Sequence, residues 1–408
     1  MSEPSSRPYD VVIIGAGPGG AATAHYLALA GLHVLLLDKF SFPRDKTCGD
    51  GLTPRALRIL DEMGLLERIQ RESARHGLVR FTAPNGREVN ADIPIRDARY
   101  SHVEVLPRLA LDHLILERAI ASGATFESPA RVTDIAHDRR GVVVTAERGK
   151  RMVTYAARMA VIATGANMAL LTKIGLLKRQ PAVMLACRAY YEDISDLAKG
   201  VQCRFDGVRL PGYGWIFPVS PTRANIGAGI FRMGLAGRRM PETVRPVFDR
   251  FMQTPSMQRM LAGARQDGPL RGFPIRVDFA TAPTYGERVL LVGEAAGLVN
   301  PVTGEGIDYA LESGKLAAEH LTPMFAAGDF STRRLRAYDA QLRAAYQRLF
   351  TLCDRLRLLY LNAPVVNRAI AAASHRRDLR DLYMNIVMEN DDMMGALSPR
   401  TLATVAFG

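Results

Sequence analysis

Two short apolar runs near the start of the chain enclose a glycine-rich segment. Residues 9–14 (YDVVII) are rich in β-branched side chains, and GAGPGG leads from them into the small-residue segment AATAHYLALAG. A second apolar run, HVLLL, follows and reaches Asp38. This pattern predicts a strand, a tight turn, a helix and a second strand, which together form the βαβ unit of a dinucleotide-binding α/β domain.

The glycines of the first turn have the spacing that such a unit requires. Gly15, Gly17 and Gly20 match GxGxxG. The first permits the turn, the second lets the backbone approach a pyrophosphate, and the third lets helix and strand pack closely. Asp38 stands where a carboxylate accepts a hydrogen bond from a ribose hydroxyl. A purely structural turn is the alternative, but the strand, the helix and the acidic strand end all favour a cofactor.

A second cofactor-facing turn is predicted later in the chain. Residues 290–321 read as an apolar strand, a glycine-containing turn and a helix that begins near Gly306, with Glu294 at the strand end. The N–H groups at the helix start could hold a ribityl chain and the electron-rich edge of a reduced flavin. The alternative is an ordinary crossover from strand to helix.

The middle of the chain alternates apolar and polar positions, which predicts strands. Residues 78–94 read as two strands around Asn85 and Gly86, a hairpin signal. Residues 181–276 contain enough alternating runs and turn signals for an antiparallel sheet. We expect the hairpin to join that sheet.

One strand of this predicted sheet, GYGWIFP, carries aromatic residues at every second position. Tyr213, Trp215 and Phe217 therefore share one face, while Gly212 and Gly214 leave the other face nearly bare. The aromatic face is either the core beneath a helix or the wall of a long apolar cavity beside a flavin.

Two further segments have helical spacing. PRLALDHLILERAIASG opens at Pro107, with Arg108 near its start. From Thr332 the chain is helical and basic, with apolar residues three and four positions apart and arginines between them. This C-terminal segment either packs on its domain or offers a basic face to an anionic bilayer.

Composition adds a marked basic excess to the picture of a globular protein. The 408 residues are 48% hydrophobic, and the formal net charge of +12 favours acidic partners such as diphosphates or anionic membranes. No nucleic-acid motif accompanies that charge. The scattered Cys48, Cys187, Cys203 and Cys353 indicate neither a zinc site nor a disulfide framework. Without a secretory or membrane-spanning pattern, we expect a cytoplasmic protein, with peripheral membrane contact as the alternative.

Five segments together carry a family pattern. They are YDVVIIGAGPGGAATA with Asp38, PRDKTCGDGLTPRAL, PRLALDHLI, GYGWIFP and VGEAAGLVNPVTGEGIDYAL. With them the chain resembles, over nearly its whole length, the FAD-dependent geranylgeranyl reductase family of the para-hydroxybenzoate hydroxylase-type flavoproteins. The resemblance implies noncovalently bound FAD and hydride delivery from its reduced form to carbon-carbon double bonds of an isoprenoid chain. NADPH and ferredoxin are both open as electron donors.

The resemblance places the loop PRDKTCGDG at the active site and brings Arg108 to the flavin; otherwise Arg108 is a solvated basic residue. Cys48 is the candidate catalytic residue, either as a proton donor to the alkene or as a small hydrophobe that shapes the pocket or senses redox state. Arg44, Lys46 and Arg55 could recognise a diphosphate, unless they are simply solvated. The candidate substrate-binding residues are Tyr213, Trp215 and Phe217, and the candidate FAD-binding residues are Gly15, Gly17, Gly19, Gly20, Asp38, Lys39, Arg44, Cys48, Gly49, Asp50, Arg108, Gly293, Glu294, Gly304, Gly306 and Ile307.

Two positions depart from the family pattern. The usual aspartate of the second FAD motif is Glu294 here, which keeps the charge on a side chain one methylene longer. Where related hydroxylases carry an aspartate-glycine pair, this chain has Ala163, Thr164 and Gly165. The chain has no second GxGxxG with an acidic strand end for a resident NADPH domain.

We therefore expect an α/β protein with a Rossmann-like FAD-binding domain, an antiparallel-sheet substrate domain and a C-terminal helical region. The leading function is reduction of a geranylgeranyl chain on a diphosphate, a chlorophyll-type pigment, a glycerolipid or a menaquinone. The alternatives are a flavin-dependent monooxygenase or halogenase acting on an aromatic substrate, and a nonenzymatic flavin protein that binds membrane or nucleic acid. The oligomeric state is open. The predicted FAD-binding parts are 1–77, 107–180 and 277–331, the substrate-sheet hairpin is 78–106, the substrate domain is 181–276 and the C-terminal helices are 332–408.

Overall fold

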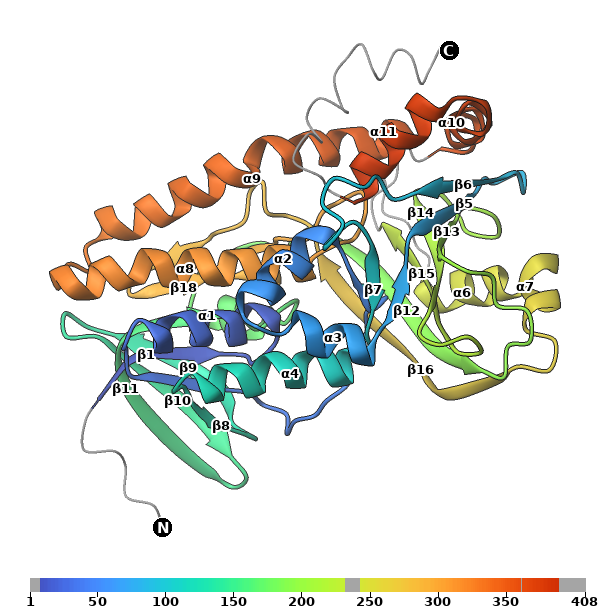
Figure 1. Cartoon of the computed structure of the whole chain (residues 1–408). Helices are drawn as coiled ribbons and strands as arrows, with labels where there is room; N and C mark the ends of the chain where they lie inside the picture. Colours follow the sequence, from blue (N-terminus) through green and yellow to red (C-terminus); the bar gives the residue numbers. More distant parts are fainter. Residues whose placement is uncertain (1–7, 232–242, 361, 389–408) are drawn as a thin grey trace.

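The computed structural model of the chain describes residues 8–231, 243–360 and 362–388. Two large sheets stand side by side; the long helix α9 (Thr332–Tyr360) runs across the top of Figure 1, and α10 (Ala363–His375) and α11 (Arg377–Val387) lie at its upper right. This arrangement of a parallel sheet, an antiparallel sheet and C-terminal helices confirms the predicted fold class. The predicted regions 1–77, 181–276 and 332–408 each include residues outside the described ranges.

The first sheet contains the predicted βαβ unit. Its central strands pair in parallel, with β1 between β11 and β2. The last four residues of β1 are buried, which suits a continuous apolar run covered on both faces. The strand order is β17 (Tyr285–Gly286), β18 (Val289–Leu291), β11 (Arg151–Ile162), β1 (Tyr9–Ile14), β2 (Val34–Leu37) and β8 (Thr125–Glu127), and the antiparallel β9 (Arg131–His137) and β10 (Val142–Arg148) extend β11.

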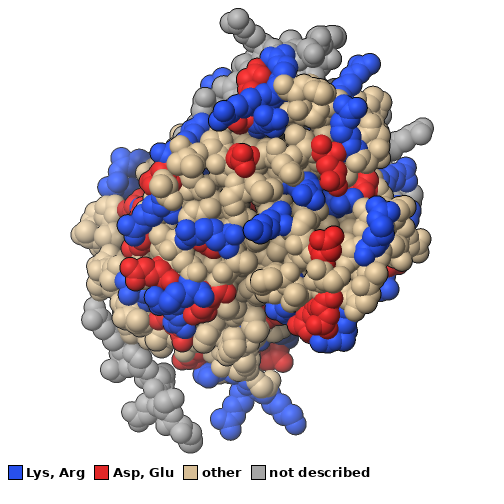
Figure 2. Space-filling view, turned by 45° about the vertical axis from the view of Figure 1, so that its right-hand side comes forward, with Lys and Arg blue, Asp and Glu red and all other residues tan. Residues whose placement is uncertain are grey.

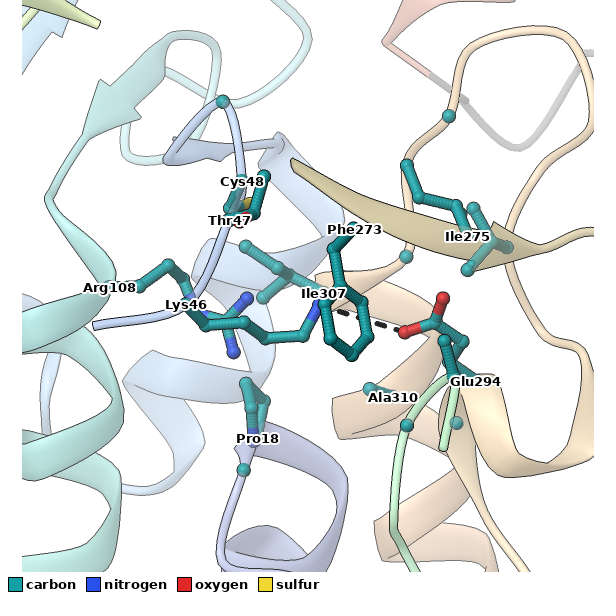
Figure 3. A pocket seen from close by; sticks show the side chains of 18 of the residues that line it. Pro18, Lys46, Thr47, Cys48, Arg108, Phe273, Ile275, Glu294, Ile307 and Ala310 are labelled. Atoms are coloured by element: carbon teal, nitrogen blue, oxygen red, sulfur yellow. Dashed lines mark ion pairs between the residues drawn. The ribbon is translucent and has the colours of Figure 1, made fainter. Parts of the chain in front are cut away.

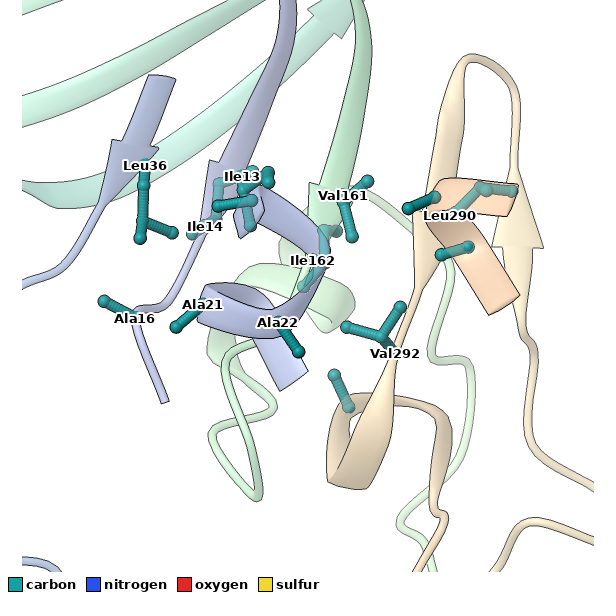
Figure 4. Packing of buried hydrophobic residues seen from close by; sticks show 14 of the residues in the cluster. Ile13, Ile14, Ala16, Ala21, Ala22, Leu36, Val161, Ile162, Leu290 and Val292 are labelled. Atoms are coloured by element: carbon teal, nitrogen blue, oxygen red, sulfur yellow. The ribbon is translucent and has the colours of Figure 1, made fainter. Parts of the chain in front are cut away.

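Small residues let two helices pack closely beside this sheet. The helices are α1 (Pro18–Leu29) and α8 (Ile307–Ala327), and a Cβ atom on Gly314 of α8 would lie only 2.5 Å from the carbonyl oxygen of Gly19 in α1. The starts of both helices are thereby held near the carboxyl ends of the parallel strands. The apolar side chains that meet there include Ile13, Ala22, Ile162 and Val292 (Figure 4).

The second sheet combines the central strands with the predicted hairpin. β5 and β6 flank the Asn85-Gly86 turn, and β5 pairs in parallel with β13, whereas the other neighbouring strands are antiparallel. The hairpin thus joins the sheet that carries the aromatic strand. The strand order is β16 (Arg265–Arg276), β12 (Val183–Glu192), β15 (Ala224–Phe231), β14 (Gly212–Pro218), β13 (Val201–Arg204), β5 (Leu78–Thr82) and β6 (Glu88–Asp92).

A small sheet fixes the cysteine-containing loop against the start of a helix. In it, Gly51 pairs with Val105, so the segment just after Cys48 lies beside the segment that leads to Arg108. The three strands of this small sheet are β3 (Gly51–Leu52), β7 (Val103–Val105) and β4 (Ala74–His76).

The remaining helices before the C-terminal part are shorter than α8. They are α2 (Pro54–Glu62), α3 (Leu66–Glu72), α4 (Arg108–Ala121), α5 (Ala169–Lys173), α6 (Val244–Met252), α7 (Pro255–Met260) and the 3-10 helix η2 (Gly293–Ala296).

The C-terminal part is helical, as the sequence predicts, as far as it is described. The helices are α9 (Thr332–Tyr360), α10 (Ala363–His375) and α11 (Arg377–Val387). Apolar residues of α9 that include Leu335, Tyr338 and Phe350 are buried in the core of the first sheet, so this helix packs on the cofactor domain, whereas α10 and α11 contact β6. None of the helices in the described ranges combines the length and apolar character needed to cross a bilayer.

Candidate active site

One cavity of about 700 Å³ lies between the two sheets and receives residues from both. All the candidate site residues named from the sequence line it, apart from Gly20 and Arg55. Gly20 instead allows the close packing expected of the third glycine, because a Cβ atom there would lie 1.8 Å from the carbonyl oxygen of Gly15. The structure therefore brings into one cavity residues that the sequence analysis selected from remote parts of the chain.

The first glycine turn opens α1 toward this cavity. Gly15 has a φ of +106°, and a Cβ atom on it would lie 2.4 Å from the carbonyl oxygen of Ala163 on the neighbouring strand, so only glycine fits. Gly17 caps α1, and its missing side chain would face only the guanidinium of Arg44, 3.5 Å away. The free N–H groups and positive end of the helix dipole thus point into a space suited to a pyrophosphate.

Asp38 follows β2 at the cavity wall. Its Oδ2 accepts a hydrogen bond from the backbone N–H of Ala16 at 2.8 Å, and its Oδ1 accepts one from Phe40 at 2.9 Å. The side chain is 7% exposed and lines the cavity. Each carboxylate oxygen keeps a lone pair for a further donor, which is what a pair of ribose hydroxyls requires.

The second glycine turn faces the same space. Glu294 accepts a hydrogen bond from the backbone N–H of Arg276 at 3.0 Å, and its other oxygen lies 3.7 Å from Nζ of Lys46 (Figure 3). Gly306 caps α8, whose first turn also lines the cavity. Lys46 also lies 5.6 Å from the ring centroid of Phe273, at the open side of the cavity. The Glu294 side chain is one methylene longer than the usual aspartate of the family pattern. Its contacts with Arg276 and Lys46 accommodate that extra length.

Cys48 lies on the cavity wall beside Arg108. Burial raises the pKa of the Cys48 thiol, and the positive charges of Arg108 and Lys46 and the backbone N–H of Asp50 oppose that rise only in part. The thiol therefore keeps its proton at neutral pH, while these neighbouring groups favour the thiolate that proton loss would leave.

The buried carboxylate of Asp112 binds two arginines, Arg108 and Arg44, beside the Cys48 loop. Asp112 accepts hydrogen bonds from Nε and Nη2 of Arg108 at 2.6 and 2.8 Å and lies 3.0 Å from Nη1 of Arg44. Arg108 is 4% exposed, so the interpretation of Arg108 as a solvated residue is wrong. Arg44 and Lys46 line the cavity, whereas Arg55 is bound to Glu312 and is not part of the cavity wall.

The aromatic strand β14 turns three rings toward the cavity. Tyr213 and Trp215 lie with ring centroids 6.1 Å apart, and the phenol of Tyr213 donates a hydrogen bond to the carbonyl of Thr303. The ring of Phe217 packs on the cysteine loop, where a Cβ atom on Gly49 would lie 3.0 Å from it. The aromatic face therefore lines the cavity, the second of the two alternatives open from the sequence.

The opposite face of β14 is not bare. A Cβ atom on Gly214 would lie 2.7 Å from the ring of Phe251, so α6 fills the space that the glycine leaves. The prediction of a nearly bare face is corrected here, because a glycine on a sheet face admits a large side chain from the covering helix.

Beyond the aromatic strand the cavity continues as an apolar arm. The arm runs between the second sheet and the last described turn of the chain, and the described residues at its end are apolar. We call the residues at that end the far wall: they are Val79, Phe81, Val201, Val387 and Met388.

Two residues of the site gave little signal in the sequence. Asn225 is fully buried; its Nδ2 donates to the backbone carbonyl of Cys48 and to Asp50, both at 2.7 Å, and its Oδ1 accepts from the indole of Trp215 at 2.9 Å. Tyr190 donates a hydrogen bond to Asp50 at 2.6 Å. A lone asparagine in the apolar strand ANIGAGIF is the one clue that could have pointed to this network.

Comparison with known proteins agrees with this geometry. The family model described as FAD binding domain matches residues 8–352. Menaquinone reductase of Mycobacterium tuberculosis is 36% identical over 86% of this chain and 83% of its own, and digeranylgeranylglycerophospholipid reductase 1 of Methanopyrus kandleri is 30% identical over 84% and 88%. The crystal structure of a geranylgeranyl bacteriochlorophyll reductase-like protein from Thermoplasma acidophilum shares the fold, with a TM-score of 0.81 at 20% identity over 96% of this chain and 100% of that one.

Fold and site together define an FAD-dependent oxidoreductase. More closely, the chain belongs to the FAD binding domain family, within the group that contains these menaquinone and digeranylgeranylglycerophospholipid reductases. The resemblance seen in the sequence motifs is thereby confirmed. Flavin-dependent halogenases have the same fold, so the fold by itself does not select between reduction and halogenation.

The residues present fit FAD. The turn at Gly15 and Gly17 would hold the pyrophosphate, Asp38 the adenosine ribose, and the start of α8 the flavin end.

Loss of the Asp38 carboxylate, in an Asp38→Ala variant, is expected to weaken FAD binding about tenfold or more, because a charge-assisted hydrogen bond contributes about 1.5–3 kcal/mol. Titration of the apoprotein with FAD measures this. Asp10→Ala is the matched control, since Asp10 binds the backbone of His33 away from the cavity; equal FAD affinity in both variants would contradict the assignment.

Proposed function

We propose that the protein reduces carbon-carbon double bonds of an isoprenoid chain with hydride from reduced FAD. One observation carries the proposal: a single cavity joins both FAD-binding turns to an apolar arm, with the Cys48 thiol between them. An isoprenoid chain is long, flexible and uncharged, and it fits an arm lined by aliphatic and aromatic side chains. The names of the relatives at 36% and 30% identity point to the same substrate class.

The chain's own residues meet the main difficulty of this reaction. An isolated alkene has no carbonyl to absorb charge, so a proton must reach one carbon as hydride reaches the other. Tyr213, Trp215 and Phe217 would fix the alkene and exclude water, and Cys48 would supply the proton. The thiol suits this step because it is protonated at rest and its conjugate base is stabilised by Arg108.

The menaquinone tail is the first substrate to test, ahead of geranylgeranyl groups on a diphosphate, a glycerolipid or a chlorophyll-type pigment. The reason is that the menaquinone reductase of Mycobacterium tuberculosis is more similar to this chain than the digeranylgeranylglycerophospholipid reductase is. The donor that reduces the flavin is either NADPH or ferredoxin, and comparing the two as reductants of the bound FAD decides between them.

The test is anaerobic. The FAD-loaded protein is reduced with dithionite and mixed in turn with menaquinone, geranylgeranyl diphosphate and a geranylgeranylated lipid, while flavin absorbance and product mass are followed. Reoxidation coupled to a gain of two hydrogens per step supports the proposal, provided that the gain persists after air has reoxidised the quinone head group and lies in the prenyl chain. A flavin that stays reduced with every prenyl compound and reacts only with oxygen and an aromatic substrate would replace it with the halogenase or monooxygenase alternative.

We also propose that the basic C-terminal helices contact an anionic membrane surface, where isoprenoid lipids reside. The outward side of α9 carries exposed arginines that include Arg336, Arg348 and Arg355, while its apolar side is buried. Figure 2 shows basic side chains spread over one face of the molecule with acidic ones between them. Such a surface binds anionic lipid by electrostatic attraction and without insertion.

This contact predicts a salt-dependent association with lipid. The protein is expected to co-sediment with vesicles that contain phosphatidylglycerol, to bind phosphatidylcholine vesicles weakly, and to dissociate as salt screens the charges. The triple variant Arg336→Glu, Arg348→Glu and Arg355→Glu should lose the association. Equal binding to both kinds of vesicle would contradict the proposal.

A further inference from the structure

Lys46 and Glu294 form an ion pair in the part of the cavity that would hold the flavin end of FAD. Nζ of Lys46, on the Cys48 loop, lies 3.7 Å from Oε2 of Glu294, in the second glycine turn. Figure 3 shows the Lys46 side chain reaching across the pocket toward Glu294. Pro18 at the start of α1 and Ile307 at the start of α8 line the same space. The pair therefore places one positive and one negative charge where both FAD-binding turns face.

The carboxylate of Glu294 is held in this place by the protein. Its Oε1 accepts a hydrogen bond from the backbone N–H of Arg276 at 3.0 Å, and Arg276 is fully buried. Its Oε2 faces Lys46 and the backbone of Gly165, where an added Cβ atom would lie 3.4 Å from that oxygen. The Glu294 side chain is only 11% exposed. A partly buried negative charge is thus fixed at the flavin end of the cavity.

The ammonium group of Lys46 keeps hydrogen-bond donors for a further acceptor. Its distance of 3.7 Å from Glu294 is that of an ion pair and lies beyond hydrogen-bond length. Two arginines on the same wall differ in this respect, because Arg108 and Arg44 both bind Asp112, at 2.6 and 3.0 Å. Among these three cations, Lys46 is therefore the one that is least tightly bound to a carboxylate.

Charges at this position act differently on oxidised and reduced flavin. A flavin ring that takes up two electrons and one proton gains one negative charge, and nearby protein charges change the free energy of that step. A positive charge stabilises the reduced form and a negative charge destabilises it. The side chains of Lys46 and Glu294 are 29% and 11% exposed, so water screens them less than it screens charges on the open surface.

We propose that Lys46 stabilises the reduced form of the bound FAD and offsets the opposing charge of Glu294. The two side chains then shift the reduction potential of the flavin in opposite directions. Together they set how readily a donor such as NADPH or ferredoxin reduces it. The inference rests on FAD binding and goes beyond the proposed function, because it does not depend on which substrate receives the hydride.

The first test measures the reduction potential of the FAD-loaded protein by anaerobic titration with dithionite in the presence of a redox dye. Lys46→Met removes the charge and should shift the equilibrium about tenfold toward oxidised FAD, which lowers a two-electron potential by about 30 mV. Lys46→Arg keeps the charge and should stay close to the wild-type potential. An unchanged potential in FAD-loaded Lys46→Met overturns the proposal.

Lys315→Met is the matched control. Lys315 of α8 forms an ion pair with Glu62, and its side chain is 31% exposed, close to the 29% of Lys46. It is not among the described residues that line the cavity. Its loss should leave the potential unchanged. Equal shifts in Lys315→Met and Lys46→Met would indicate an effect of net charge and contradict a local role for Lys46.

The second test uses the opposite signs of the two charges. Glu294→Gln keeps an oxygen that can accept from Arg276 but removes the negative charge, so the potential should rise by a similar amount. The double variant should return close to the wild-type value. Shifts in the same direction in both single variants would mean that loss of the contact, and not of a charge, changes the potential, and the proposal would be wrong. If Glu294→Gln does not retain FAD, the Lys46 variants and the Lys315 control decide.

Failure of this inference and failure of the proposed function are separate results. The potentials are measured without any prenyl compound. If the wild type reduces no prenyl compound and the potentials still shift as expected, the role of Lys46 stands and the proposed function fails. If prenyl reduction is observed and the potential of Lys46→Met equals that of the wild type, the proposed function stands and this inference is wrong.

Discussion

Replacement of Cys48 by alanine is expected to lower the rate of prenyl double-bond reduction about 10²- to 10³-fold, the usual size of the loss when a positioned acid is removed. The reason is that the Cys48 thiol lies on the cavity wall with its proton in place, and the positive charge of Arg108 and the N–H of Asp50 favour its conjugate base. The measurement is flavin reoxidation in a single anaerobic turnover, with product mass as confirmation.

The control for this prediction is a second thiol on the same cavity. Cys203→Ala removes a sulfur from the apolar part of the cavity wall, far in sequence from the loop, and should change the rate only a few-fold. Both variants should retain FAD. A Cys48→Ala variant that reduces its substrate at the wild-type rate would show that the thiol only shapes the pocket.

Gly20→Ala is expected to abolish FAD retention and to destabilise the fold by several kcal/mol. The new Cβ atom would lie 1.8 Å from the carbonyl oxygen of Gly15 and 3.0 Å from the Cβ of Ala163, and backbone directly after the central strand β1 cannot move aside as a flexible side chain would. Helix α1 would have to leave the sheet, and with it the N–H groups that face the cavity. FAD content after purification and the thermal midpoint report the two effects.

Gly77→Ala is the matched control for this change. It makes the same substitution at a glycine without a positive φ, where an added Cβ atom would meet no atom within 4 Å. That variant should bind FAD normally and melt within about 2 °C of the wild type. If Gly20→Ala also purifies with full FAD, then FAD binding does not depend on the close packing of helix α1 against the backbone at Gly15.

The cofactor half of the site could be predicted from sequence because its requirements are main-chain requirements. Three such requirements leave a local pattern in the amino-acid sequence. They are a turn that only glycine can make, a strand formed by a continuous apolar run, and a helix that starts beside an anion. Within one short segment, Gly15 makes such a turn, Gly17 caps α1 and Asp38 follows a buried strand, and the start of the helix after Gly306 also lines the cavity.

The polar network behind Cys48 could not be predicted, because its members meet only after two sheets have assembled. Tyr190 and Asn225 lie opposite each other on paired strands β12 and β15, and their shared partner Asp50 comes from a loop far away in sequence. Nothing local distinguishes such a tyrosine from one that packs in the core. The face behind Gly214 was misjudged for the same reason, since Phe251 reaches it from a helix of another segment.

The two ends of the apolar arm differ in how freely their side chains can be substituted during evolution. At the near end, the ring of Phe217 rests on the main chain at Gly49 and Gly51, so a change of side chain there also moves the Cys48 loop. At the far wall, Val387 and Met388 come from the last described turn of the chain, a segment remote in sequence from the Cys48 loop. Preference for longer or shorter isoprenoids can therefore drift by substitutions at the far wall while the chemistry stays the same, which makes that wall the place to redesign chain-length selectivity.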